Sequence, residues 1–397
     1  MRLADRALNI SPSPTLAIDA KAKEMKARGV NVISFGAGEP DFGTPAHIKE
    51  AAIAAIHVGM TKYTAVSGII ELKEAICQRL KLDQGLSYEP NQIVVSSGAK
   101  QTLYNAMQVL VQPGDEVIVP VPYWVSYIEQ IKLAGAEARI VETREDNGFK
   151  LTADELEQAI NPRTRLLILN TPNNPTGAVY AREELAALAR VIMQHDIMVL
   201  SDEIYDKLIY DGHSHCSIAS LSPELKERTV VINGVSKAYA MTGWRIGYAA
   251  CNAKLAKTMT DLQSHSTSNA NSIAQAASVA AISGDQSPTE MMRSEFQNRR
   301  DYMLERLRAI PGITCSRPNG AFYLFPNVKS YFGKSYKGIK VNSATDLADL
   351  LLHEAKVALV PGISFGNDNY FRLSYACSME NIKEGLHRIA SLLANLR

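Results

Sequence analysis

A lysine and an arginine lie in a run of small residues that directly follows an apolar segment. The run is GVSKAYAMTGWRIG, from Gly234 to Gly247, and it contains Lys237 and Arg245. A lysine that attacks a carbonyl group needs a lowered pKa, which partial burial beside a second cation provides. A lone lysine would be interpreted as a surface residue of a loop. The whole pattern, whose small residues leave room for a flat ligand, favours a nucleophile.

A carboxylate and a group of amides stand at the ends of two further apolar segments. Asp202, in VLSDEIY, follows one of them, where strands of open α/β sheets present residues to ligands. There it can keep a ring nitrogen protonated, or alternatively cap the next turn. The segment NTPNNPTG, from Asn170 to Gly177, ends the preceding strand. Its Pro and Gly residues direct side-chain amides into the same cleft, unless it is a plain Asn-Pro turn.

Two positions favour the binding of anions. In the segment SSGAKQ, the backbone N–H groups of Gly98, Ala99 and Lys100 can converge on an anion at the start of a helix. A bare strand-to-helix turn would have the same appearance. Arg372 stands inside an apolar segment, YFRLS, that predicts a strand. Because burying a guanidinium without an anion is costly, it should meet either a carboxylate side chain or a ligand carboxylate.

Aromatic and metal-binding residue types give one further candidate. Trp124, one of the two tryptophans, lies in PYWVS after an apolar strand, which favours stacking on a ligand ring over burial in the core. His213 and His215 are interpreted as part of a solvated loop, because no further ligand group accompanies them, and no metal site is expected. The five cysteines form no CxxC, so neither a disulfide framework nor a structural zinc is expected.

From about residue 93 the chain alternates short apolar runs with amphipathic segments, which is typical of βαβ units. Buried parallel strands are predicted at residues 93–95, 117–119, 166–169, 198–200 and 230–232. Helices are predicted between them and, upstream, at residues 14–28, 45–58 and 68–82. The fold class is therefore α/β, with a mostly parallel sheet flanked by helices.

The pattern changes after about residue 285. A long charged helix (residues 289–308), short strands (321–325 and 370–374) and a C-terminal helix predict a second, smaller α/β domain. We expect a large domain of residues 46–285, with residues 1–45 and 286–397 forming an N-terminal arm and the small domain. A cleft between closely packed domains is the expected ligand site.

Charge and hydropathy exclude several classes of protein. The 397 residues have a formal net charge of +1, which gives no electrostatic support for a nucleic-acid or anionic-membrane partner. Hydrophobic residues make up 46% of the chain, enough for a large core. Neither a signal-peptide core nor a long uncharged apolar stretch is visible, so a cytoplasmic protein is expected.

The run from Gly234 to Gly247 resembles the active-site lysine signature of class I pyridoxal 5'-phosphate (PLP) dependent aminotransferases, which have fold type I. The resemblance extends from Gly38 to Arg372. The motifs AGEPD, PYWVS and MTGWR are most similar to the prokaryotic subgroup of aspartate aminotransferases. This resemblance implies PLP as cofactor and a homodimer with shared active sites.

The resemblance also implies a role for each candidate residue. Lys237 would carry the cofactor and move the substrate proton, Asp202 would pair with the ring nitrogen, and Tyr205 would donate to the phenolic oxygen. Cofactor contacts are implied for Gly98, Ala99, Lys100, Trp124, Asn174, Ser236 and Arg245, and for Tyr63 from the neighbouring subunit. Substrate contacts are implied for Gly38, Lys100, Trp124, Asn174 and Arg372, with Arg372 on the α-carboxylate.

The implied reaction is a ping-pong transfer of the amino group from L-aspartate to 2-oxoglutarate. Residues 264–271 contain no arginine to read the distal carboxylate from the partner subunit, so Lys100 is expected to do so, with Thr15 closing over it. A lysine binds a carboxylate with less directional selectivity than the planar fork of an arginine. Aromatic amino acids or prephenate therefore stay alternative substrates.

Two other classes of function fit the sequence less well. A carbon-sulfur lyase could use the same scaffold and cofactor. A ligand-sensing domain of a transcription regulator would need an additional N-terminal DNA-binding domain. The resemblance already begins at Gly38, so the residues before it are too few for such a domain.

Overall fold

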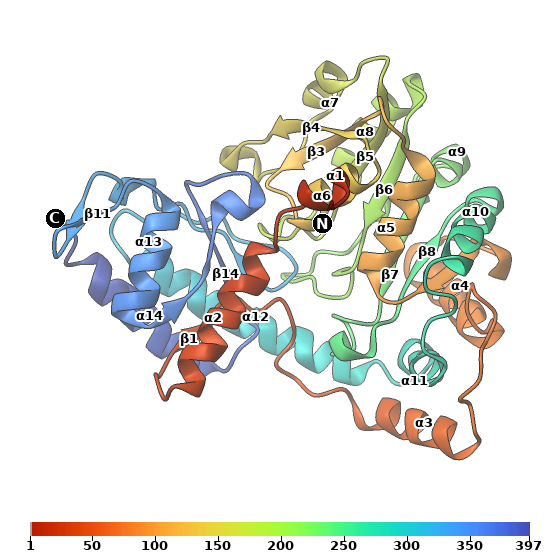
Figure 1. Cartoon of the computed structure of the whole chain (residues 1–397), viewed down its shortest axis with the longest axis horizontal. Helices are drawn as coiled ribbons and strands as arrows, with labels where there is room; N and C mark the ends of the chain where they lie inside the picture. Colours follow the sequence, from red (N-terminus) through yellow and green to blue (C-terminus); the bar gives the residue numbers. More distant parts are fainter. Residues whose placement is uncertain (1) are drawn as a thin grey trace.

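A seven-stranded sheet forms the centre of the computed structural model, which describes residues 2–397 (Figure 1). Its strand order is β2-β8-β7-β6-β5-β3-β4. The strands are β2 (Ile93–Ser96), β3 (Glu116–Val121), β4 (Glu137–Glu142), β5 (Thr164–Asn170), β6 (Met198–Asp202), β7 (Thr229–Gly234) and β8 (Gly247–Ala250). Strand β8 is antiparallel to both of its neighbours, and the other pairs are parallel. The carboxyl ends of all the other strands therefore meet at one edge.

All five apolar runs of the sequence form strands of this sheet, namely β2, β3, β5, β6 and β7. They are buried on both faces, as continuous apolar strands of a parallel sheet should be. The sequence did not predict β4 or β8. Strand β4, EARIVE, is mostly exposed at the sheet edge and therefore lacks an apolar run, and β8, GYAA, is short and built of small residues.

Helices cover both faces of the sheet. They are α3 (Ala46–His57), α4 (Ile70–Gln84), α5 (Ala99–Leu110), α6 (Ser126–Leu133), α7 (Ala153–Ala159), α8 (Arg182–Gln194), α9 (Pro223–Glu227), α10 (Ala253–Ser264) and α11 (Ser272–Ser283). Leu103 and Met107 of α5 pack with Val117 on one face, whereas Leu185 and Leu188 of α8 pack on the other. These helices follow the predicted apolar periodicity, and the α/β architecture is confirmed.

Most of the remaining elements gather beside the sheet, towards the left of Figure 1, whereas the short helix α1 is drawn over the sheet. They are α1 (Asp5–Leu8), α2 (Pro14–Ala27), β1 (Ile33–Ser34), α12 (Ser287–Arg308), β9 (Tyr323–Leu324), β10 (Ser335–Tyr336), β11 (Ile339–Lys340), α13 (Ala344–Leu350), β12 (Val357–Ala358), β13 (Val360–Pro361), β14 (Phe371–Ser374) and α14 (Met379–Leu393). Strands β13, β14 and β9 form a three-stranded antiparallel sheet. The pairing of β1 with β12 joins the N-terminal segment to the C-terminal part of the chain.

The long helix α12 and the predicted short strands around β9 and β14 lie where the sequence predicts them. Phe35, next to β1, shares a hydrophobic cluster with Phe296 of α12 and Leu386 of α14. This packing supports the grouping of the N-terminal residues with those after residue 285. The boundaries themselves stay a prediction. Within residues 2–397, no helix combines the length and the apolar character needed to cross a membrane.

Candidate active site

A cleft of about 430 Å³ opens at the carboxyl edge of the central sheet. Most of the residues that the sequence singles out line it: Gly38, Ala99, Lys100, Trp124, Asn174, Asp202, Tyr205, Ser236, Lys237, Arg245 and Arg372. They come from the carboxyl ends of β2, β3, β5, β6 and β7 or the loops that follow them, from the loop after β1, and from β14 on the neighbouring sheet. The fold thus brings together groups that are up to several hundred residues apart in the chain. Such a convergence of charged and polar groups in one cleft is typical of an active site.

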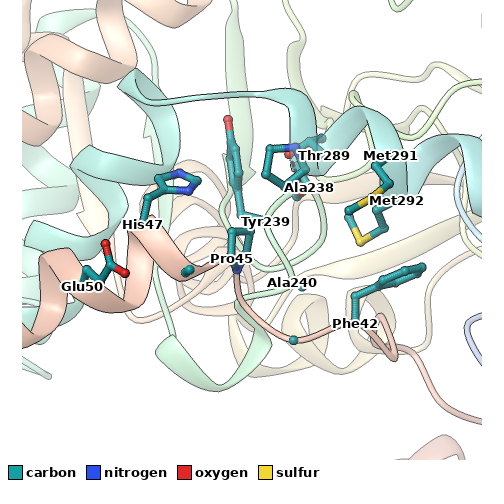
Figure 2. A pocket seen from close by; sticks show the side chains of 13 residues that line it. Phe42, Pro45, His47, Glu50, Ala238, Tyr239, Ala240, Thr289, Met291 and Met292 are labelled. Carbon is teal, nitrogen blue, oxygen red and sulfur yellow. Dashed lines mark hydrogen bonds between the residues drawn. The ribbon is translucent and has the colours of Figure 1, made fainter.

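A second cavity, of about 540 Å³, is lined in part by residues 238–240, which directly follow Lys237 (Figure 2). It is lined by Phe42 and His47 near the start of α3, by Tyr239, and by Met291 and Met292 of α12. None of the predicted site residues lines it. Its wall is mainly apolar, so the smaller cleft with its converging charges is the candidate active site.

Lys237 follows β7 and lies within the cleft, where its Nζ donates a hydrogen bond to the backbone carbonyl of Gly38. Burial lowers the pKa of Lys237 to about 8; Glu39 opposes this effect, whereas Arg245 and Arg372 add to it. A substantial fraction of neutral amine is therefore present near neutral pH. A neutral amine is the form that attacks a carbonyl or accepts a proton from carbon.

Asp202 ends β6 and is only 4% exposed. Burial raises the pKa of its carboxyl group to about 6, although hydrogen bonds from Tyr127 and from the backbone of Ile204 lower it. Tyr127 donates its hydroxyl to Oδ2 at 2.6 Å, and the Ile204 N–H donates to Oδ1 at 3.3 Å. Asp202 therefore caps the following turn and also lines the cleft, so the two interpretations of this residue are compatible.

Replacing Tyr127 by phenylalanine should destabilise the cofactor-free protein more at pH 8 than at pH 5. The folded-state pKa of Asp202 lies above its ordinary value, so its ionised form is the one that opposes folding as the pH rises. Without the Tyr127 hydroxyl that pKa rises further, and we expect a loss of about 1–2 kcal/mol at pH 8. Urea unfolding at both pH values measures it. Tyr104→Phe serves as the control, and equal losses at both pH values would argue against this role.

An anion-binding cup is formed at the N-terminus of α5. Among the described residues, the backbone N–H groups of Ala99 and Lys100 have no acceptor. Arg245 lies beside them, with its guanidinium held by the carbonyls of Thr242 at 2.9 Å and Ser97 at 3.4 Å. A helix N-terminus, two free N–H groups and a guanidinium are a strong combination for a phosphate.

The role of Gly98 in this cup differs from the sequence prediction. Its N–H donates to the carbonyl of Ser96 at 2.8 Å and is not free for an anion. Instead, Gly98 supplies space: it has a φ of +87°, and a Cβ here would lie 2.2 Å from the guanidinium of Arg245. Gly247 acts similarly, since a Cβ there would lie 2.1 Å from the nitrogen of Ala99.

Arg372 on β14 is 2% exposed and has no acidic partner among residues 2–397. Its Nη1 donates to Asn174 Oδ1 at 3.1 Å and its Nη2 to the carbonyl of Gly36 at 2.7 Å, while Nε is buried without a partner. Its guanidinium lies 4.5 Å from the ring centre of Tyr323. The alternative of a structural salt bridge is therefore excluded for the described chain. A buried cation of this kind is suited to a ligand carboxylate.

Two tyrosines of the site were not predicted from the sequence. Tyr127 is one of them, and its position one helical turn after Trp124 was a signal that could have been used. The other is Tyr323, whose hydroxyl shares a hydrogen bond of 2.8 Å with that of Tyr205. Tyr323 stands in a predicted strand, but only the packing of β9 against the turn after β6 places it in the cleft.

Lys100 and Trp124 form the wall of the cleft next to the anion-binding cup. The Nζ of Lys100 lies 4.9 Å from the ring centre of Trp124. Burial, and then the charge of Arg245, lower the pKa of Lys100. Ser13 and Thr15 near the start of α2 also line this side, as expected for a segment that covers it. Besides Lys237 and Arg245, Lys100 thus adds a further cation to the cleft that Arg372 lines.

Tyr63 and the two histidines of the segment from His213 to His215 lie outside the cleft. Tyr63 is 90% exposed, so it does not reach the site of its own chain, and its implied contact with a neighbouring subunit stays a prediction. The interpretation of His215 as part of a solvated loop is wrong, because its side chain is 7% exposed and pairs with Glu203. His213 is exposed as expected. Within residues 2–397, no group of three or more His, Cys, Asp or Glu side chains is arranged to hold a metal ion.

Comparison with known proteins gives a consistent result along the whole chain. The family described as aminotransferase class I and II matches residues 30–389. An aspartate aminotransferase of Geobacillus stearothermophilus is 54% identical over 98% of each chain. An aspartate/prephenate aminotransferase of Nitrosomonas europaea is 47% identical over 99% of this chain and 100% of the relative. The crystal structure of the aspartate aminotransferase from Rhizobium meliloti matches with a TM-score of 0.97, 46% identity and 100% coverage of both chains.

The family match spans the segments that carry the central sheet and most of the residues that line the cleft. A lysine of lowered pKa, a buried aspartate, an anion-binding helix N-terminus and an unpaired buried arginine meet in the region that the family match spans. The chain belongs to the class I and II aminotransferase family.

Proposed function

We propose that the protein is a PLP-dependent aminotransferase that transfers the amino group of L-aspartate to 2-oxoglutarate, giving oxaloacetate and L-glutamate. The observation that carries the proposal is the buried Arg372, which faces the same cleft as Lys237 without an acidic partner in the described chain. Relatives named aspartate aminotransferase at 54% and 50% identity over the full length support the choice of substrate.

The residues of the cleft fit PLP. The cup at the N-terminus of α5, with Arg245 and Ser236, suits a phosphate, and the space that Gly98 leaves beside the Arg245 guanidinium is part of that fit. The buried carboxylate of Asp202 suits a protonated ring nitrogen, and Trp124 offers an aromatic face. Asn174 and Tyr205 line the same cleft, where they would bind the phenolic oxygen of PLP. When bound, PLP supplies an electron sink for the carbanion at the substrate α-carbon.

Within this arrangement, Lys237 is the attachment residue and the proton carrier. Its Nζ would take the proton from the substrate α-carbon and deliver it to the C4′ carbon of PLP, which its pKa of about 8 favours near neutral pH. The fork of Arg372, aligned by Asn174, binds the α-carboxylate and fixes the direction of the α-hydrogen. Because one site binds the amino acid and then, after the first oxo acid has left, the second oxo acid, the kinetics should be ping-pong.

We also propose that residues 1–45 and 286–397 close over the cleft when a substrate binds. Arg372 and Gly36 come from this part of the chain, whereas Lys237 and Asp202 come from the central sheet. A substrate carboxylate on Arg372 therefore links the two parts. Closure would exclude water during the proton transfer.

A homodimer with shared sites is part of the proposal. Tyr63 is 90% exposed, and the neighbouring surface carries exposed apolar side chains, including Val58 at 82% and Ile56 at 53%. A second copy that covers this surface would bring Tyr63 to the partner's phosphate cup. Sedimentation velocity of the purified protein tests this: a monomer at micromolar concentration would contradict it.

A coupled assay tests the proposed reaction. The protein, loaded with PLP, should form oxaloacetate from L-aspartate and 2-oxoglutarate, and omission of either substrate should abolish the product. Formation of pyruvate from a cysteine conjugate instead would identify a carbon-sulfur lyase. Absence of both products would contradict the proposal.

One observation favours a second substrate class. The distal end of the substrate would meet Lys100 and Trp124, a single charge beside an aromatic face, and not a bidentate arginine. Aromatic amino acids or prephenate are therefore the alternative. The name aspartate/prephenate aminotransferase of the Nitrosomonas europaea relative agrees with it.

Lys100→Ala should weaken the use of dicarboxylates more than that of aromatic substrates. Loss of one partly buried cation should lower kcat/KM for L-aspartate by about 10–100-fold and leave L-phenylalanine within a few fold. Lys23→Ala is the matched control, because Lys23 also lines the cleft but already pairs with Asp19 at 2.8 Å. Equal losses for both substrates in Lys100→Ala would remove this lysine from the recognition of the distal carboxylate.

A further inference from the structure

A buried ion pair lies directly behind Asp202. Glu203, the next residue, is fully buried, and its Oε2 accepts a hydrogen bond from His215 Nε2 at 2.8 Å. Its Oε1 accepts from the hydroxyls of Ser201 at 2.8 Å and Ser217 at 2.6 Å. Successive side chains at a strand end point to opposite sides, so Asp202 faces the cleft while Glu203 faces the interior beneath it.

Two adjacent carboxylates at one buried strand end are costly unless a cation balances them. Lys237 lies on the cleft side of Asp202, and His215 is the only basic side chain that contacts Glu203 in the described chain. Burial alone would lower the pKa of His215, but the charge and the hydrogen bond of Glu203 outweigh it, so the pKa is raised. The pKa of Glu203 is correspondingly lowered against the effect of burial.

Other titratable groups around the pair increase the need for a cation. Asp206, one turn further along, adds negative charge near His215. Lys207 is less available to offset it, because it pairs with Asp83 of α4. Tyr88 and Tyr248 stay neutral, because burial first, and then nearby charges that include Glu203, raise the pKa values of their hydroxyls.

We infer that His215 and Glu203 act as a positioning pair: the imidazolium of His215 balances Glu203, so that the adjacent Asp202 stays ionised towards the ring nitrogen of the cofactor. Glu203 acts on Asp202 through charge, since like charges raise each other's pKa, and through the backbone that the two residues share. The inference rests on the proposed function. It assigns a role in the active site to a histidine outside the cleft.

Nitrogen NMR of the wild-type protein tests the charge of the pair without any substitution. With ¹⁵N-labelled histidine, both ring nitrogens of His215 should be protonated at pH 7.5 in the PLP-loaded protein. A His215→Gln sample assigns the signal. A neutral imidazole at this pH would overturn the inference.

A double-mutant cycle tests the effect on the cofactor. In His215→Gln, the glutamine can keep a hydrogen bond to Glu203 but carries no charge. The ring nitrogen of ¹⁵N-labelled PLP should lose its proton at a lower pH than in the wild type. The dissociation constant of PLP should rise about tenfold, which corresponds to a shift of about one unit in the pKa of Asp202. The combination with Glu203→Gln removes both charges and should restore both values to near wild type.

The outcomes separate the inference from the proposed function. A wild-type protein that binds no PLP would contradict the function itself. A wild type with a protonated ring nitrogen that His215→Gln leaves unchanged would contradict only the inference, as would a double variant no better than His215→Gln. His213→Gln, at the exposed histidine two residues away, is the matched control. If His215→Gln does not fold, Glu203→Gln alone still tests the inference. A purely structural role of the pair predicts that this variant binds PLP more weakly. The charge-balance role predicts that the ring nitrogen of PLP stays protonated in it.

Discussion

Lys237→Ala is expected to lower turnover by roughly 10⁴-fold or more while the protein still binds PLP. The substitution removes the amine that moves the substrate proton, whereas the phosphate cup of Ala99 and Arg245 and the carboxylate of Asp202 remain. Steady-state rates with L-aspartate and 2-oxoglutarate measure the first effect. Equilibrium dialysis with PLP measures the second.

The control for this substitution is Lys254→Ala on the exposed surface of α10, which should change neither quantity. Lys237→Arg adds a second comparison, because it restores the positive charge without a neutral amine near pH 7. Turnover within a few fold of the wild type in Lys237→Ala would refute the assignment of the proton carrier.

Arg372→Lys is expected to lower kcat/KM for L-aspartate by about 10²-fold, and Arg372→Leu by more. Lysine keeps the charge but cannot offer two parallel N–H groups to a carboxylate, and it leaves the amide oxygen of Asn174 and the carbonyl of Gly36 with a poorer donor. Steady-state kinetics over a range of aspartate concentrations give the value.

Protein stability separates binding from folding in these variants. Arg372 is buried without an acidic partner in the described chain, so its replacement by leucine should not lower the melting temperature by more than a few degrees. Arg190→Lys on the exposed face of α8 is the matched control. Full activity of Arg372→Lys would show that the α-carboxylate is bound elsewhere.

The sequence predicts the central sheet well because its strands are buried on both faces. The runs that become β5, β6 and β7 contain almost only apolar residues, so no amphipathic pattern is needed to find them. Strand β4 was not predicted because it is exposed to solvent at the sheet edge and therefore has no apolar run. Strand β8 was not predicted because its residues are small and form no apolar run. At its start, Gly247 is needed because the backbone passes close to Ala99.

The candidate site is predictable to the extent that its residues follow strands. Asp202 and Lys237 stand directly after apolar runs, and their chemistry is visible from their neighbours. Tyr323 was not predicted because only a contact between segments far apart in sequence brings it to Tyr205. His215 was interpreted wrongly because its loop folds back onto Glu203, which its own neighbours in sequence do not indicate. The hydrogen bond of Gly98 N–H to Ser96 depends on local backbone geometry, which residue type alone does not determine.

The most direct test of the proposed function is a single-turnover absorbance measurement on the PLP-loaded protein. L-aspartate, L-phenylalanine and L-alanine are mixed with it at equal concentration, and the rate of the spectral change is compared. We predict that L-aspartate converts the cofactor fastest. Faster conversion by L-phenylalanine would contradict the dicarboxylate specificity and indicate an aromatic aminotransferase, and no change with any of the three would contradict the transfer of an amino group altogether.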